Sequence, residues 1–235
     1  MERLDRARVK TALVIGAHPD DPEFGAGGTV AAWGEKGWEF HYLIVTDGSK
    51  GTPDATQDPR LLIQTRQQEQ QKAASILGVQ SVEFLGLPDG EVQPDQNLLE
   101  KLVAILRKRK PHAVFTHNPE ALEYRRPGGR PHIAHRDHRA VGQTVLDAVY
   151  PVARDPHYFP AHHAAGLTPH KVREVYLWGS PQANLRVDIR QTLQRKLDAI
   201  VQHRSQISPE HPRIVRARQT GRPGFEYFLR LRISP

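Results

Sequence analysis

Two short stretches of the sequence carry side chains that could bind a metal ion. The first, His18-Pro-Asp20-Asp21, follows directly on the apolar run 13–17. His18 and Asp21 offer a nitrogen and an oxygen, which are donors that Zn²⁺ accepts in catalytic sites where one position stays open for water. Asp20 cannot easily reach the same ion from the opposite side of the chain, so it is a candidate general base. The stretch therefore predicts a metal site with a carboxylate base beside it.

The second stretch, His135-Arg-Asp137-His138, can supply the missing ligand. Histidines three residues apart at the start of a helix lie on one side of it. The aspartate between them can hold a ring nitrogen and fix which tautomer is present. Together the two stretches provide the nitrogen and oxygen donors of a tetrahedral site without cysteine.

Two other readings of the first stretch are possible from the residues alone. The paired aspartates could only cap a helix, and the glycines that follow would suit a tight turn. Alternatively, Gly25 and Gly27 near a helix start, with Asp47 after the next apolar run, resemble a dinucleotide fingerprint. That pattern lacks its third glycine, because position 30 is Val30, and about nine residues separate the strand from the glycines where a tight turn is required.

The elements around these stretches alternate between apolar runs and helical patterns. An alternation of this kind predicts a Rossmann-like open, mainly parallel sheet flanked by helices. The carboxyl ends of the first and fourth runs, which precede His18 and Asn118, would then face a common crevice, and Asn118 is a candidate for substrate binding. Strands are expected at 11–17, 40–46, 82–86, 113–116, 172–178, 186–189 and 225–233, and helices at 29–37, 60–77, 97–110 and 135–150.

Helix ends are also expected at particular residues. Gly78 is placed to end the helix 60–77, and Asn97 to begin the next one. Asp188 and Gln191 could form a capping box for a helix that runs to His203.

Length and composition favour one domain over residues 1–235. Residues 119–134 and 151–170 lack periodicity and are expected to be insertions, the first a lid and the second an interface or crevice wall. There is no cysteine, no apolar region near the N-terminus typical of a signal peptide, and no apolar run long enough to span a membrane. We therefore expect a cytoplasmic protein without a membrane partner.

The formal net charge of +7 raises the question of a nucleic-acid partner. The basic clusters are not interleaved with aromatic residues, and we interpret them as solvated surface rather than as a nucleic-acid site. They lie at 107–110, at 125–126 and between 213 and 232.

The two metal motifs together resemble those of the PIG-L or LmbE-like family of zinc-dependent de-N-acetylases. Pro22 after the paired aspartates and Arg136 before Asp137 depart from the usual family pattern, but every ligand position is kept. The resemblance extends over most of the chain, through the segments 46–48, 66–69, 77–79, 85–90, 196–200 and 203–206.

The resemblance implies a function and a role for each site residue. His18, Asp21 and His138 would be the zinc ligands, Asp20 the general base, His135 the oxyanion partner and Asp137 the residue that orients His135. Arg66 would hold a substrate hydroxyl or acidic group. The implied reaction is removal of the N-acetyl group from an N-acetylglucosamine-type sugar by a metal-bound water, in a homo-oligomer, a trimer or hexamer.

Two functions of other classes remain as alternatives at this point. A basic nucleic-acid-binding module would need neither zinc nor Asp20. A nucleotide-binding oxidoreductase is disfavoured by Val30.

Overall fold

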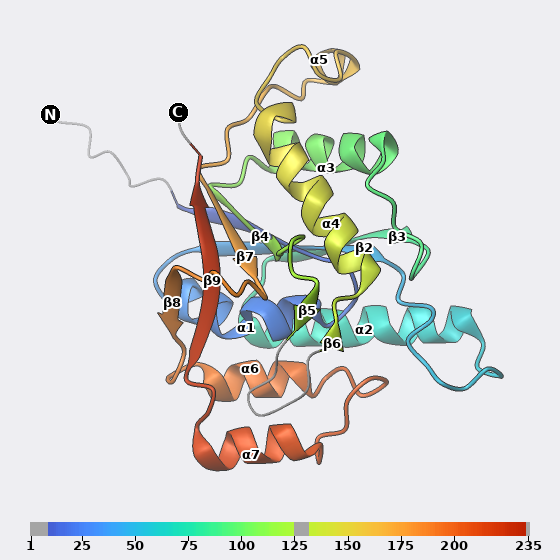
Figure 1. Cartoon of the computed structure of the whole chain (residues 1–235), viewed down its shortest axis with the longest axis vertical. Coiled ribbons are helices and arrows are strands. Elements are labelled where there is room, and N and C mark those ends of the chain that lie inside the picture. The colour runs from blue at the N-terminus through green and yellow to red at the C-terminus, as the bar shows by residue number, and fades with distance from the viewer. Residues whose placement is uncertain (1–8, 125–131, 234–235) are drawn as a thin grey trace, which may run out of the picture.

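The computed structural model describes residues 9–124 and 132–233, and its centre is a twisted sheet with helices on both faces (Figure 1). Over the described residues the sheet has seven strands in the order β3-β2-β1-β4-β7-β9-β8. The first five in this order pair in parallel, and β9 runs antiparallel to both its neighbours. The expected mainly parallel α/β sheet is therefore confirmed. Its strands are β1 (Thr11–Gly16), β2 (Glu39–Thr46), β3 (Ser81–Leu87), β4 (Ala113–His117), β7 (Glu174–Trp178), β8 (Leu185–Asp188) and β9 (Phe225–Arg232).

The helices cover the sheet in two layers, each with its own apolar core. In Figure 1 the helices α1, α2 and α6 lie below the sheet and α3 and α4 above it. The central strands β1, β2, β4 and β7 are mostly buried because both faces of the sheet are covered there, which explains why they read as nearly continuous apolar runs. The helices of the lower layer are α1 (Asp21–Gly34), α2 (Pro59–Leu77) and α6 (Leu193–Ile200), and those of the upper layer are α3 (Gln96–Arg109) and α4 (Arg136–Asp147).

The first helix begins earlier than the sequence pattern predicts. We expected a loop up to position 28 and a helix over 29–37, but α1 starts at Asp21 and runs through the glycines. These glycines do not form a turn; they let the helix approach its neighbours, since a Cβ at Gly25 would lie 2.5 Å from the Trp178 ring and one at Gly28 2.7 Å from Ile189. Asp21 and its neighbours are therefore fixed at a helix N-terminus that packs closely on the sheet.

Helix ends agree with the predictions at some positions and differ at others. Gly78 ends α2 with a positive φ of 79°, as expected. Helix α3 is capped by Asp95, whose carboxylate accepts from the Leu98 N–H at 2.8 Å, so the expected cap at Asn97 is wrong. The capping box at Asp188 is also wrong, because that carboxylate binds Arg190 and α6 begins only after Thr192.

The excursion at 151–170 is held to the body of the protein by Arg107. This arginine is 1% exposed and donates to the carbonyls of Ala153, Tyr158, Val152 and Asp155. It is therefore a structural residue rather than part of a solvated basic face, which corrects our interpretation for this position. Helix α4 is followed by η1 (Ala148–Val152), which is kinked at Tyr150, where φ is −146° and ψ is 123°. The segment 151–170 itself contains the short helix α5 (Ala161–Ala164).

The proposed lid at 119–134 is described only at its two ends. These ends pair as the short strands β5 (Glu123–Tyr124) and β6 (His132–Ile133). Arg125, Arg126 and Arg130, the residues of this segment that could donate to sugar hydroxyls or to an acidic group, lie outside the described residues, and a lid function stays a prediction.

Two further features complete the fold. Helix α7 (Pro212–Thr220), which the sequence pattern did not predict, packs beside α6 (Figure 1). Among the described residues, no helix combines the length and apolar character needed to cross a membrane.

Candidate metal and catalytic site

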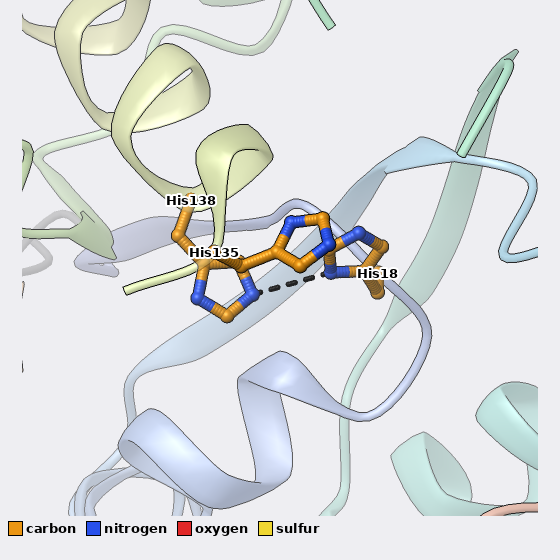
Figure 2. A group of neighbouring side chains, drawn as sticks. All are labelled: His18, His135 and His138. Atoms are coloured by element: carbon orange, nitrogen blue, oxygen red, sulfur yellow. Dashed lines mark hydrogen bonds between the residues drawn. The ribbon is translucent and has the colours of Figure 1, made fainter. Parts of the chain in front are cut away.

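The sequence-predicted metal ligands meet at the carboxyl ends of β1 and β4. This is the point where the strand order reverses between the two halves of the sheet, the usual crevice of an open α/β sheet. His18 comes from the loop after β1, and His135 and His138 come from the N-terminal turn of α4. Figure 2 shows the three imidazole rings converging from these two sides of the crevice.

The three predicted ligands are spaced as a metal site requires. His18 Nδ1 lies 3.2 Å from His138 Nε2, His138 Nε2 lies 3.2 Å from Asp21 Oδ1, and His18 Nδ1 lies 3.5 Å from Asp21 Oδ2. Tetrahedral Zn²⁺ with ligands at about 2.0–2.1 Å separates neighbouring ligand atoms by about 3.3 Å. The donor set therefore fits a zinc ion, with the two histidines facing different oxygens of the Asp21 carboxylate.

Other groupings of possible ligands overlap with this one. Among the described residues, His135 forms a set with His18 and His138, and His117 forms another with Asp21 and His138. The hydrogen bonds of His117 argue against ligation, because Trp178 Nε1–H donates to its Nδ1 at 3.0 Å. The ring proton must then sit on Nε2, which donates to Asp21 Oδ2 at 3.1 Å and so does not accept from the Ala17 N–H, 3.3 Å away.

His117 is therefore best placed to support a ligand. Its ring is 1% exposed, and burial lowers its pKa to about 4 against the opposing effect of Asp21, so the ring is neutral at pH 7. A neutral ring held by Trp178 fixes the orientation of the Asp21 carboxylate, as outer hydrogen bonds commonly do around metal sites.

Two carboxylates hold the other nitrogen of His18. Its Nε2 lies 3.1 Å from Asp89 Oδ1 and 3.3 Å from Asp137 Oδ2, which leaves Nδ1 to face His138 and Asp21. Burial alone would lower the pKa of His18, but hydrogen bonds to Asp137, Asp21 and Asp89 outweigh it and raise the pKa to about 12. The surroundings thus strongly favour a cation at this position, which a metal ion would supply in place of the proton.

The structure gives Asp137 different partners from those that the resemblance implied. Its carboxylate accepts from the Gly90 N–H at 2.7 Å and the Val92 N–H at 3.3 Å, and contacts His18. Toward His135 it is the backbone that acts: Asp137 N–H donates to His135 Nδ1 at 3.2 Å. This bond leaves Nε2 as the nitrogen of His135 that can donate to a bound molecule.

Asp20 is held in an uncommon backbone conformation at the edge of the site. Its φ is 110° and its ψ −28°, and its side chain makes no hydrogen bond to cap α1, so the purely capping role is not observed. A non-glycine residue in such a conformation costs of order 1–3 kcal/mol. Burial and the neighbouring Asp21 raise the pKa of Asp20 to about 6, against the lowering effect of Arg66. A carboxylate with this pKa suits a general base working near neutral pH.

The two candidate substrate-binding residues are both buried. Arg66 is 3% exposed, donates to the carbonyls of Pro19 at 2.7 Å and Gly48 at 2.9 Å, and lies 3.6 Å from Asp20. Asn118 is also buried, and its Oδ1 accepts from the Glu120 N–H at 3.2 Å. Contacts of either residue with a substrate stay predictions.

Several residues around the site were not singled out from the sequence as site residues. His117 and Asp89 follow or end strands at the same edge of the sheet as His18, so the rule that found His18 could have included them. Trp178 and Gln70 carry no such signal, because each acts on a residue far away in the sequence.

Comparison with known proteins gives a consistent set of matches. Residues 13–149 match the model of the PIG-L family, described as GlcNAc-PI de-N-acetylase. The chain is 33% identical over 198 residues to a diacetylchitobiose deacetylase of Thermococcus kodakarensis, covering 84% of this chain and 70% of that protein. It is 28% identical over 199 residues to a probable N-acetyl-alpha-D-glucosaminyl L-malate deacetylase 2 of Bacillus cereus, covering 83% and 82%. The fold superposes with a TM-score of 0.83 on the N,N'-diacetylchitobiose deacetylase of Pyrococcus horikoshii, at 29% identity over 96% of this chain and 85% of that one.

Proposed function

Because this chain belongs to the PIG-L family of de-N-acetylases, we propose that it hydrolyses the acetamide of an N-acetylglucosamine-type sugar or glycoconjugate. The observation that carries the proposal is the spacing of His18, Asp21 and His138, with Asp20 beside them. Neither alternative function accounts for this arrangement, since nucleic-acid binding and nucleotide binding need no such triad.

We further propose that the metal is zinc, held by His18 Nδ1, His138 Nε2 and an Asp21 carboxylate oxygen. Two nitrogens and one oxygen without sulfur are typical ligands of catalytic zinc, and the separations of 3.2–3.5 Å support this assignment. Bound there, zinc would polarise the amide carbonyl and lower the pKa of a coordinated water to about 7.

The chain's own residues then have distinct tasks. Asp20 accepts the proton of the attacking water, because its pKa of about 6 leaves it mostly ionised at pH 7. His135 donates from Nε2 to the developing oxyanion, with Nδ1 held by the Asp137 N–H. The departing amine takes the proton that Asp20 accepted from the water, because His135 carries a single ring proton, on Nε2, and would be left as an imidazolate if it gave that proton away.

The remaining parts of the proposal concern recognition and assembly. Arg66 and Asn118 are proposed to contact the sugar, and residues 119–134 to line the mouth of the site. A homo-oligomer, a single domain over residues 1–235 and a cytoplasmic location complete the proposal, which includes no nucleic-acid or membrane partner.

The function is tested by measuring acetate released from a panel of N-acetylated sugars, with mass spectrometry of the products. We expect release from at least one N-acetylglucosamine derivative. The variant Asp20→Asn should keep its zinc and lose roughly 100-fold or more in kcat, the usual range for a positioned proton acceptor. Near-normal turnover in this variant would make Asp20 a structural residue. Salt-sensitive DNA retention of equal strength in wild type and Asp20→Ala, without acetate release, would favour the nucleic-acid alternative.

A further inference from the structure

Both polar groups of the peptide bond between Pro19 and Asp20 are hydrogen-bonded to side chains of helix α2. Arg66 donates to the Pro19 carbonyl at 2.7 Å, and the Asp20 N–H donates to Gln70 Oε1 at 2.9 Å. Arg66 and Gln70 are four residues apart on α2, so their side chains lie on the same face. One turn of this helix therefore fixes the plane of the peptide that precedes the Asp20 Cα.

These two hydrogen bonds bear directly on the backbone conformation of Asp20. Rotation about the N–Cα bond relative to the fixed peptide plane defines φ, which is 110° at this residue. Such a conformation persists only where the surroundings impose it. This φ sets the direction in which the Asp20 side chain leaves the backbone, within the tight bend between His18 and Asp21.

The amide of Gln70 is itself held by a buried pair. Its Nε2–H donates to Glu23 Oε1 at 2.9 Å, and Glu23 Oε2 lies 3.1 Å from His203 Nε2. Gln70, Glu23 and His203 are each 0% exposed, so water does not compete for these bonds. A carboxylate only accepts hydrogen bonds, so Glu23 must face the amide nitrogen of Gln70, and Oε1 is left to face Asp20.

His203 anchors the far end of this chain of hydrogen bonds. It follows α6 and belongs to the segment 203–206, which no step of the proposed mechanism uses. Burial would lower the pKa of His203, but its hydrogen bond to Glu23 outweighs that effect and raises it. His203 Nε2 thus keeps the Glu23 carboxylate hydrogen-bonded on the side away from Gln70.

We propose that Gln70, backed by Glu23 and His203, is a positioning residue that holds Asp20 in its active conformation. The inference rests on the proposed function, in which Asp20 is the proton acceptor. It assigns a task to a glutamine of α2 and to the histidine after α6, neither of which touches the metal ligands directly.

The first test removes the acceptor from Gln70 while keeping its length. In Gln70→Met the Asp20 N–H has no partner, and we expect kcat to fall roughly 10- to 100-fold, the cost of a displaced catalytic group. KM and zinc content should stay within about twofold of the wild-type values, because the variant does not alter a ligand. Gln71→Met, at the exposed neighbouring position of the same helix, is the matched control and should behave as wild type.

The second test moves the carboxylate along the chain of hydrogen bonds. Gln70→Glu has the shape of glutamine but sets two buried carboxyl groups against each other, and such a pair keeps one proton until the pH is raised. We therefore compare the variants at a pH high enough to remove that proton, where the kcat of Gln70→Glu should fall at least tenfold. In the double variant Gln70→Glu with Glu23→Gln, the amide at position 23 donates to the carboxylate at position 70, which still accepts from Asp20. We expect this swap to recover kcat to within about threefold of wild type. A role limited to filling space would leave Gln70→Glu fully active.

A third measurement separates this inference from the proposed function. Hydrogen exchange of the Asp20 amide in the metal-free protein should be at least tenfold faster in Gln70→Met than in Gln71→Met. If the wild type releases no acetate but this difference is observed, the proposed function fails and the positioning of Asp20 by Gln70 holds. Wild-type kcat and wild-type amide protection in Gln70→Met would overturn the inference, as would a swap variant no faster than Gln70→Glu.

Discussion

Replacing His117 with phenylalanine should weaken zinc binding by about 10- to 100-fold without abolishing it. Phenylalanine keeps the ring that stacks on His138, whose centroid lies 3.9 Å away. It removes the donor that lies 3.1 Å from Asp21 Oδ2. The variant therefore separates the hydrogen bonds of His117, to Asp21 and from Trp178, from the packing of its ring.

The magnitude follows from what Asp21 loses and keeps. A hydrogen bond to a charged group contributes about 1.5–3 kcal/mol. Asp21 Oδ2 retains the backbone N–H of His18 at 2.7 Å, so the carboxylate is not left without a partner and the loss stays within this range. Since about 1.4 kcal/mol corresponds to a factor of ten, the loss is about 10- to 100-fold in affinity.

Two variants in strand β7 should differ in their effect on zinc affinity. Trp178→Phe removes the bond that fixes the His117 tautomer, a neutral hydrogen bond of about 0.5–1.5 kcal/mol, together with part of the ring that packs on Gly25. The loss of zinc affinity should be roughly two- to tenfold. Tyr176→Phe, on the same strand, removes a hydroxyl bonded to Glu174 away from the site and should leave zinc affinity unchanged.

The assay is competition for zinc with a chromophoric chelator, together with thermal unfolding of the metal-free variants. Zinc affinity equal to wild type in His117→Phe would refute the reasoning, because Asp21 would then be oriented without His117. If His117→Phe does not take up one zinc per chain even at saturating metal, the supporting role of His117 is also refuted, because His117 would then be a ligand.

Two other predictions concern the ligands themselves. His138→Ala should lose stoichiometric zinc on dialysis, measured by elemental analysis, because two of the three short ligand separations involve His138 Nε2; retained zinc would disprove the assignment. Zinc binding at pH 8 should release at least one proton per chain, from His18 and in addition from a coordinated water whose pKa zinc would lower to about 7, measured by calorimetry in buffers of different ionisation enthalpy. The reason is that the pKa of His18 is raised to about 12 in the metal-free chain, so the ring stays protonated until the ion displaces the proton. Because the pKa of His18 is higher in the folded chain than its ordinary value of 6.5, protonated His18 stabilises the metal-free fold fully below pH 6.5. This contribution declines as pH rises toward about 12. Zinc binding without proton release at pH 8 would contradict this account.

The sequence alone determined the parallel sheet and the residues available for a metal site. Apolar runs alternating with helical patterns require a layered α/β arrangement, and the ends of parallel strands share one edge. Because His18 and Asp21 follow one such strand and His138 begins a helix at the same edge, local sequence was sufficient to predict that they meet. Their separations of 3.2–3.5 Å agree with that expectation.

Helix boundaries were less predictable, because glycine has two uses that sequence does not separate. The glycines at 25–28 could have formed a turn, and only the packed neighbours show why they lie in α1. Trp178 and Ile189 occupy the space that side chains at Gly25 and Gly28 would need. Those neighbours come from parts of the chain more than 150 residues away.

The supports of the site were decided by the tertiary structure. His117 meets Trp178 because β4 and β7 pair in a register that sets these two residues side by side. Asp137 reaches His18 instead of the His135 ring because the loop at Gly90 and Val92 draws its carboxylate that way. Short-range patterns carry neither register nor loop position, since both depend on the packing of distant segments.

Asp20 shows most clearly which features the sequence determines and which depend on the tertiary structure. Its place after His18 marked it as a candidate base from the sequence, because a carboxylate beside two metal ligands is suited to accept a proton. Its backbone conformation depends on Gln70 in α2 and, through Glu23, on His203 beyond α6. Sequence specifies which side chains can do the chemistry, whereas buried hydrogen bonds between distant helices, formed only when the two layers pack on the sheet, decide where they point.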